Sequence, residues 1–486
     1  MPNGQIDLKV LARQTMVAAG FHPDFPPEVM KEAQTANTAA PKTSGPTVRD
    51  LRSVAWSSID NDSSRDLDQV EYVEKLPDGT LRLMVGIADV DALVPKGSAT
   101  DRQAAAETTS VYAGVATFPM LPDEFSTGAT SLLGNQERAA LVIELHIAAN
   151  GDVDCHDVSR AVIRNCSKLA YSSTGAWLAG TGPLPLAAAS VPGMDVQLRL
   201  QLETSDKLRG IRKQRGMLVF GSVETQPVME NGLVKDLTVE LHNPAEDVIE
   251  SFMVAANVAM AKFLREKSAL SIRRVVKTPK RWDRIQAIAT QFGVKLPDQP
   301  DPKALADFLD ARKAADPDHF PDLSLSVVKL LGPGEYIVET PGQEHEGHFG
   351  LAAQDYTHST APNRRYADLV TQRLLKSAAD GTPGPYTETE LAGIAAHCTE
   401  REDAAKKVER TMRKALAASW ISGRVGEVFD AIVTGASPKG TYVRLVKLPV
   451  EGMVVRGQPG LDVGDKTRVK LVGVNVAKGF IDFERK

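Results

Sequence analysis

The spacing of apolar residues changes twice along the chain, and this change most restricts the possible folds. Between residues 53 and 162, apolar residues alternate with polar ones or run together over strand lengths, and turn sequences interrupt them at residues 77–79 (PDG) and 150–151 (NG). Helical i, i+3, i+4 spacing follows in three later segments, residues 245–267, 368–377 and 388–421. Because no comparable break separates these segments, one large mixed α/β domain over residues 48–419 is expected.

The last 62 residues, 425–486, predict a separate five-stranded β-barrel of the OB-fold type. Five short apolar segments alternate there with Gly, Pro and Asp turns. Two aromatic residues, Phe429 and Tyr442, accompany the cations Lys439 and Arg444. Exposed rings beside cations are how such barrels bind single-stranded nucleic acid, so these four residues are candidates for RNA binding. A barrel with its rings buried in the core is the alternative.

Two short helices are expected ahead of the α/β domain. Asp7 is a candidate N-cap and Gly20 a candidate stop for the first helix, and the second runs from Pro26 to Asn37. Residues 38–47 have no periodic apolar set and contain two prolines, which predicts a linker. The expected division is a helical module with its linker over residues 1–47, the mixed α/β domain over residues 48–419 and the barrel over residues 425–486.

The composition is that of a folded globular chain. Hydrophobic residues make up 42% and charged residues 24%, which excludes disordered and collagen-like classes. No apolar run approaches the roughly 18 residues that would cross a bilayer, and the first ten residues lack the layout of a signal peptide, so a cytoplasmic protein without membrane contacts is expected. Cys155, Cys166 and Cys398 contain no CxxC pair and are expected to be buried thiols.

Charge is distributed unevenly along the chain. The net charge is −5, yet residues 401–486 contain 17 Lys and Arg against 10 Asp and Glu. A basic C-terminal region on an acidic body favours a polyanionic ligand at that end, although a solvated basic surface would give the same count.

Four aspartates crowd residues 57–69 (SSIDNDSSRDLDQ), namely Asp60, Asp62, Asp66 and Asp68. Asp66 and Asp68 are two residues apart, so in an extended segment their carboxylates point to the same side. Converging carboxylates repel each other unless a divalent cation lies among them, and hard oxygen ligands favour Mg²⁺ or Mn²⁺ over zinc. A solvated acidic turn is the alternative.

Two arginines, Arg364 and Arg365, follow a chain break at residues 360–362 and precede a predicted helix. Guanidinium groups at a helix start, where backbone N–H groups also point outward, form a good phosphate site. Solvent-facing arginines are the alternative. His345 and His348, spaced HxxH with a glycine between them, are interpreted as structural.

The order of four segments resembles the catalytic domain of the ribonuclease II family, also called the RNB domain. The segments are Asp60 through Asp68, SVYAGVATFPMLPDEFS (residues 110–126), EDVIESFMVAAN (residues 246–257) and YTHSTAPNRRYADLV (residues 356–370). The resemblance covers residues 48–419, and the barrel is similar to the OB-fold RNA-binding domain that follows in that family. It implies a 3′ to 5′ exoribonuclease that hydrolyses single-stranded RNA to nucleoside 5′-monophosphates with Mg²⁺. We expect that Mn²⁺ can substitute for Mg²⁺ and that the protein is a monomer.

The resemblance also implies roles for individual residues. Asp60, Asp66 and Asp68 match three of four family aspartates that hold the metals and the attacking water, and Gln69, a neutral amide, stands at the fourth position. Arg364 matches the arginine that neutralises charge on the scissile phosphate, and Arg365 lies beside it. Tyr112 matches an aromatic residue that stacks near the 3′ end and limits the length of the final product. Glu409 matches a glutamate near the terminal nucleotides. Asp66, Asp68 and Arg364 are thus the catalytic candidates.

The chain departs from the family pattern in several places. Ser359, Ala361, Asn363 and Gln372 surround the arginine pair and leave its environment open. Relatives usually carry two cold-shock OB domains ahead of the catalytic domain, whereas a small helical module of the helix-turn-helix kind is expected here. Gln69 supports an alternative function, an RNA-binding protein with a weakened or decayed nuclease site. Hydrolysis of another phosphodiester, such as DNA, is a further alternative.

Overall fold

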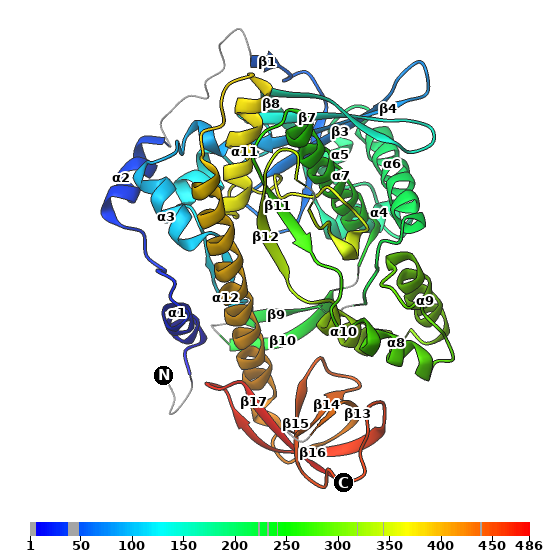
Figure 1. The fold of residues 1–486 in the computed structure, drawn as a ribbon. Helices are drawn as coiled ribbons and strands as arrows, with labels where there is room; N and C mark the ends of the chain where they lie inside the picture. Colours follow the sequence, from blue (N-terminus) through cyan, green and yellow to red (C-terminus); the bar gives the residue numbers. More distant parts are fainter. Residues whose placement is uncertain are drawn as a thin grey trace.

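The computed structural model of the chain describes residues 6–36, 48–221, 224–230, 233–240, 242–317, 319–343, 345–437 and 440–486. The expected linker over residues 38–47, the expected helix end at Asn37 and the candidate RNA-binding residue Lys439 lie outside these residues. Within the described part, helices, a curled sheet and a C-terminal barrel confirm the predicted mixed α/β fold class (Figure 1).

Six strands form the central sheet, in the order β1-β8-β2-β3-β4-β7. They are β1 (Val48–Asp50), β2 (Trp56–Asp60), β3 (Gln69–Lys75), β4 (Leu81–Ala88), β7 (Glu137–Ile147) and β8 (Val153–Ala170). The long β8 also pairs with β7, so the sheet curls back on itself. At Gly86 of β4 there is no room for a side chain, since a Cβ would lie 2.9 Å from Cγ2 of Val70, its partner in β3. Both β-hairpins, β3–β4 and β7–β8, turn at the predicted PDG and NG sequences.

Helices cover this sheet and form the main hydrophobic core with it. They are α4 (Tyr171–Leu178), α5 (Leu186–Ala189), α6 (Met194–Gln214), α7 (Pro244–Glu266) and α11 (Tyr366–Ala379). The α7 helix begins with a capping box in which the Asn243 and Glu246 side chains satisfy each other's backbone N–H groups. Helices α7 and α11 confirm the helical segments predicted from apolar spacing.

The longest helix, α12 (Glu388–Ile421), connects the sheet with the C-terminal barrel (Figure 1). Its bounds are those predicted, and a capping box of Thr387 and Glu390 starts it. At 1.5 Å per residue it spans about 50 Å. It contacts the hairpin of β9 (Glu224–Glu230) and β10 (Leu233–Glu240) through β10, and the pair β11 (Ser271–Val276) and β12 (Gly334–Glu339) through both strands.

The two N-terminal helices pack on different parts of the body. Asp7 caps α1 (Leu8–Ala18) by accepting hydrogen bonds from the N–H groups of Lys9 and Val10, at 2.9 and 3.2 Å. Helix α1 packs against α12, whereas α2 (Pro27–Ala36) packs against α3 (Ala99–Glu107). Both predicted helices are therefore present.

A group of three helices has a hydrophobic cluster of its own, which includes Trp282 and Phe320. The helices are α8 (Trp282–Gln291), α9 (Pro302–Ala315) and α10 (Phe320–Leu331). The remaining short elements are η1 (Val90–Ala92), β5 (Val111–Tyr112), β6 (Thr117–Phe118), η2 (Glu124–Ala129), η3 (Phe349–Leu351) and η4 (Ser422–Arg424).

The C-terminal strands close into the predicted five-stranded barrel, in the order β13-β14-β15-β17-β16. They are β13 (Val428–Ser437), β14 (Gly440–Leu445), β15 (Glu451–Arg456), β16 (Lys466–Asn475) and β17 (Phe480–Arg485). Alternate residues such as Val443, Leu471 and Phe483 fill its interior. Ala418 and Ile421, at the end of α12, belong to the same cluster and fix the barrel to the body.

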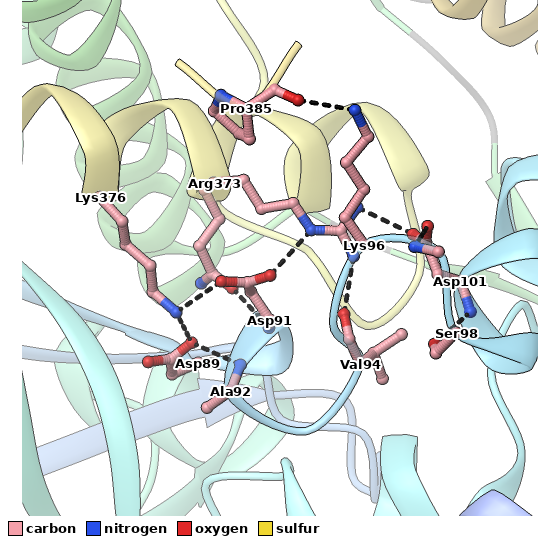
Figure 2. Close-up of polar contacts among 12 residues, drawn as sticks. Asp89, Asp91, Ala92, Val94, Lys96, Ser98, Asp101, Arg373, Lys376 and Pro385 are labelled. Atoms are coloured by element: carbon pink, nitrogen blue, oxygen red, sulfur yellow. Dashed lines mark hydrogen bonds and ion pairs between the residues drawn. The ribbon is translucent and has the colours of Figure 1, made fainter. Parts of the chain in front are cut away.

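A buried ionic network anchors α11, the helix that follows the predicted phosphate site (Figure 2). Lys376 pairs with Asp89 and, at 3.0 Å, with Asp91. Arg373 pairs with Asp91 and Asp101, both at 2.8 Å, and donates to the Val94 carbonyl at 2.7 Å. These carboxylates come from the segment after β4, so the network joins α11 to the sheet end where β3 begins.

Two further expectations concern cysteines and membranes. Cys398 is buried as predicted, but Cys155 and Cys166 are only half-buried, because they lie on the partly exposed strand β8. No helix in the described part of the chain is both long and apolar enough to span a bilayer.

Candidate active site

The loop between β2 and β3 carries the three predicted aspartates. Asp60 ends β2, and Asp66 and Asp68 lie just before β3. Leu67, between the last two, is 1% exposed, and its backbone N–H donates to Ser131 Oγ at 3.0 Å. This buried leucine anchors the loop and thereby fixes the backbone positions of Asp66 and Asp68.

Asp68 contacts the segment that carries the predicted phosphate site. Its Oδ1 accepts the backbone N–H of Asn363 at 3.0 Å, and its Oδ2 lies 3.4 Å from Nε of Arg364. Burial raises the pKa of Asp68 to about 7, while the Arg364 charge and the Asn363 N–H oppose this shift and the Asp66 charge adds to it. The structure thus brings two candidates together that are almost 300 positions apart.

The aspartates also influence one another. Burial raises the pKa of Asp66, and the charge of Asp60 raises it further. Asp60 Oδ1 accepts hydrogen bonds from Asn61 N–H and Ser64 Oγ, both at 2.7 Å. The three carboxylates therefore form one electrostatically coupled group.

Tyr112 and Glu409 meet beside this group. The backbone N–H of Tyr112 donates to Glu409 Oε1 at 3.1 Å, and the N–H of Ser110 donates to the Arg364 carbonyl at 3.0 Å. The Tyr112 residue is 44% exposed. Burial of its hydroxyl raises the pKa of Tyr112 to about 12, with the Arg364 charge opposing and the Asp66 charge adding. The segment that carries Tyr112 is thus joined by backbone hydrogen bonds to Glu409 and to the turn that carries Arg364.

The two arginines have different surroundings. Arg365 makes two hydrogen bonds of 2.7 Å to the buried carboxylate of Asp368, which also accepts the Ala361 N–H at 2.8 Å. Arg364 is the freer of the pair, with its side chain 44% exposed against 26% for Arg365. Arg364 is thus better placed to bind a ligand, whereas Arg365 stabilises the turn at residues 361–365 through Asp368.

The four residues that depart from the family pattern are all buried and hold this turn in place. Ser359 donates its N–H and Oγ to Asn257 Oδ1, at 2.8 and 2.9 Å. Asn363 Oδ1 accepts the Thr130 hydroxyl at 2.6 Å. Gln372, in α11, donates to a carbonyl at the end of β4 at 2.8 Å. The residues are Ser359, Ala361, Asn363 and Gln372.

The barrel candidates differ in how available they are. Tyr442 is 41% exposed, whereas Phe429 is half-buried under the Arg424 guanidinium, which lies 4.8 Å from its ring centre. Arg444 pairs with Asp322 of α10 at 3.0 Å. Tyr442 is therefore the most accessible of the three described barrel residues.

The aspartate group offers oxygen ligands of the kind that hard divalent cations prefer. Gln69, 7% exposed at the start of β3, adds a neutral amide. Two other groups in the described residues hold three metal-ligating atoms within 4.8 Å of one another, Glu144–His146–His156 and Glu339–His345–Asp355. The coupled, partly buried aspartates fit a cation, but they are not drawn together as tightly as those two groups.

One buried carboxylate near the site was missed by the sequence analysis. Glu71 of β3 is fully buried, and neither of its oxygens has a hydrogen-bond partner among the described residues. Burial raises its pKa well above the usual value, and the Asp60 charge adds to this. The sequence offers no clear signal for it, because Glu74 and Lys75 of the same strand are also charged but are not buried.

Comparison with known proteins agrees with this geometry. Residues 48–381 match the RNB domain, and residues 427–486 match the RNase II-type exonuclease C-terminal S1 domain. The chain belongs to the RNB-domain family. Ribonuclease R of Thermotoga maritima is 31% identical over 94% of this chain, and ribonuclease R 1 of Lactococcus lactis is 28% identical over 98%.

The chain spans 65% and 60% of the length of these two relatives, respectively. Among solved structures, Mycoplasma genitalium RNase R in complex with ribose-methylated single-stranded RNA is similar to this chain with a TM-score of 0.88. That match covers 99% of this chain and 78% of the other at 23% identity, so it shows a shared RNB-family fold.

Proposed function

We propose that this RNB-family chain is a 3′ to 5′ exoribonuclease that hydrolyses single-stranded RNA to nucleoside 5′-monophosphates. The observation that carries the proposal is the contact between buried Asp68 and Arg364, with Tyr112 and Glu409 beside them. A carboxylate group, a phosphate-binding cation and a stacking ring at one place are what phosphodiester hydrolysis at a strand end requires. The RNA bound to the Mycoplasma relative supports the substrate class.

Asp60, Asp66 and Asp68 would hold Mg²⁺, for which Mn²⁺ would substitute, and Gln69 would add a neutral oxygen. When bound, such a cation supplies positive charge to phosphate oxygens and lowers the pKa of a water molecule. Burial of Asp68 beside the Asn363 N–H holds its carboxylate in one orientation before any ligand arrives.

The other residues bind and orient the strand. Arg364 offsets the charge that grows on the phosphate oxygens, because its guanidinium is partly exposed beside Asp68. Tyr112 stacks on a base near the 3′ end, and Glu409 fixes its backbone. Arg365 supports the Arg364 turn through Asp368 and borders the phosphate site.

The barrel would hold the RNA upstream of the active site. Its exposed Tyr442 offers a ring for base stacking. Phe429, Lys439 and Arg444 are the further candidate contacts. We also propose that the chain has three domains: the helical module with its linker over residues 1–47, the catalytic domain over residues 48–419 and the barrel over residues 425–486. The proposed active form is a monomer.

The test is digestion of 5′-labelled single-stranded RNA with Mg²⁺ and then with a chelator, resolving products by length. We expect stepwise shortening from the 3′ end, release of nucleoside 5′-monophosphates and full dependence on the metal. Asp68→Asn should lower the rate by at least about 100-fold, a loss of roughly 2.7 kcal/mol in transition-state stabilisation. Its RNA affinity should stay within about threefold, because the change keeps the side-chain volume.

Asp62→Asn is the matched control, since Asp62 lies in the same loop but is exposed and accepts only the Ser172 hydroxyl. This variant should retain its activity. RNA binding without hydrolysis at any metal concentration would instead establish the decayed-nuclease alternative.

A further inference from the structure

Two histidines and a glutamate converge on the sheet, away from the aspartates. Glu144 and His146 lie two residues apart in β7, so their side chains leave the strand on the same side. His156 comes from the neighbouring strand β8, and its ring stacks on that of His146 with centroids 4.1 Å apart and planes 10° apart. One ligand atom from each of the three residues lies within 4.8 Å of the other two.

The strand pairing shows why His156 faces this group. Glu144 pairs with Asp157 and Leu145 pairs with Cys155, so His156 is the additional residue of a β-bulge. A bulge redirects a side chain out of the regular alternation. His156 thereby projects beside His146 without a strand partner of its own.

His146 has an unused ligand atom. Its Nε2 is buried, lies 3.7 Å from Glu144 Oε1 and has no hydrogen-bond partner among the described residues. A buried ring nitrogen without a partner costs free energy. A metal ion bound between this nitrogen and the Glu144 carboxylate would satisfy both.

The surrounding charges admit a cation. Arg49 lies 3.3 Å from Glu144 and 2.9 Å from Asp157, and Arg82 lies 2.8 Å from Glu74 and 3.5 Å from Glu144. Three carboxylates therefore face two guanidiniums, which leaves a net negative charge. The second oxygen of Glu144 pairs with Arg49. The first lies 3.5 Å from Arg82 Nε, which makes no hydrogen bond among the described residues, so a metal ion would take this oxygen in place of the Arg82 contact.

We propose that Glu144, His146 and His156 form a second metal site, which takes Zn²⁺ through two imidazoles and one carboxylate. This ligand set is typical of zinc sites that keep one position open for water. Tetrahedral ligands about 2.1 Å from zinc lie roughly 3.4 Å apart. Each imidazole binds a metal in the plane of its ring, so the two stacked rings must turn out of their parallel arrangement to complete the site.

This site is separate from the proposed catalytic one. His146 is the strand partner of Arg82 in β4. At the other end of β4, the backbone N–H of Ala88 donates to the Asp68 carbonyl at 2.9 Å. Six residues of strand separate the two positions, which is about 20 Å. The two sites also select different metals, because imidazole nitrogen suits zinc whereas a group of carboxylates alone suits magnesium or manganese.

The test is competition of metal-stripped protein against a chromophoric chelator for Zn²⁺, with Co²⁺ absorption as a second readout. The wild-type chain should take one equivalent of Zn²⁺ and give the intense visible absorption of four-coordinate Co²⁺. His156→Asn and His146→Asn should each lower the Zn²⁺ affinity at least tenfold and abolish that absorption.

Two controls make the result specific. His22→Asn removes an exposed histidine that is also paired with a glutamate, Glu107, and should behave as wild type. Asp68→Asn should keep the cobalt signal, because the signal does not come from the aspartate site. His156 is exposed, so its variant should fold, which circular dichroism checks. Unchanged Zn²⁺ affinity in both histidine variants, or no Zn²⁺ uptake by the wild-type chain, would overturn the site whatever the ribonuclease assay shows.

Discussion

His348, at the turn before the phosphate-site segment, is held neutral by its surroundings. Burial lowers the pKa of His348 to about 4, and the charge of Arg274 contributes. Its Nδ1 accepts the Leu351 N–H at 3.2 Å, and its ring lies edge-on to Tyr356. His358 is half-buried, and its pKa is lowered in the same direction by burial and by nearby arginines.

We predict that His348 makes the chain less stable in mild acid. Its folded-state pKa is below the unfolded value of about 6.5, so the unfolded chain takes up a proton first as pH falls, and stability decreases between pH 6.5 and 4. His348→Asn removes this proton site but keeps an acceptor for Leu351. Between pH 7.5 and 4.5 the wild type should lose roughly 2 to 3 kcal/mol more than the variant in urea unfolding.

Other groups titrate alike in the wild type and in His348→Asn, so their effects on stability drop out of the difference between the two proteins. His22→Asn, at an exposed position, should follow the wild type at both pH values. Equal pH dependence in wild type and His348→Asn would show that His348 titrates alike in the folded and unfolded chain.

At this scale the sequence indicated residue types better than environments. Asp68 and Arg364 were predicted, and the structure puts them in contact. The backbone N–H of Asn363 and the unpartnered carboxylate of Glu71 were not, because a hydrogen bond to a main-chain group and the absence of a partner depend on segments far apart in the chain.

At the scale of elements, α11 depends on buried charges. The Lys376 side chain is 8% exposed and is shared by Asp89 and Asp91, with the Asp89 carboxylate 6% exposed (Figure 2). We predict that Lys376→Met destabilises the chain by about 3 to 5 kcal/mol, because it leaves a buried carboxylate without its cation. Ribonuclease activity should fall as well, since Arg364 lies at the start of this helix.

Lys96→Met provides the contrast at a nearby ion pair outside this network (Figure 2). The Lys96 side chain is 36% exposed, pairs with Glu390 at 2.9 Å and donates to the Pro385 carbonyl at 2.6 Å, so its loss should cost about 1 kcal/mol. Thermal and urea unfolding measure both variants. Adding Asp89→Asn to Lys376→Met should recover part of the stability, and no recovery would mean that the loss arises from packing.

The helices were more predictable than the sheet edges. α12 begins and ends at the predicted residues, because its capping box and apolar spacing are local signals. The single pair that joins β2 to β3, Ser57 with Glu71, was not predictable. Farther along β3, the Gln197 side chain of α6 donates to the Val73 carbonyl and accepts the Val73 N–H, both at 2.8 Å. A helix side chain thus makes the backbone hydrogen bonds that a neighbouring strand would make, and this depends on tertiary packing.

For the whole molecule, α12 sets the distance between the candidate active site and the barrel. Glu409, which contacts Tyr112, lies 12 residues before the end of this helix, or about 18 Å. A trinucleotide that fills the active site has no further bases for the barrel, whereas a strand of some 30 nucleotides can contact both. Substrate length therefore separates the contributions of the two domains.

We predict that Tyr442→Ala weakens binding of a 30-nucleotide single strand by about 5- to 100-fold and leaves trinucleotide hydrolysis unchanged. One stacked base contributes roughly 1 to 3 kcal/mol, and the Tyr442 ring is exposed on the barrel. Val446→Ala, at another exposed barrel position, should change neither quantity because it removes no ring. Fluorescence anisotropy at fixed salt gives the affinities, and product analysis gives the rates. An unchanged affinity for the long strand would place the RNA path on another face of the barrel, whereas a slower trinucleotide reaction would mean that the barrel acts on the active site itself.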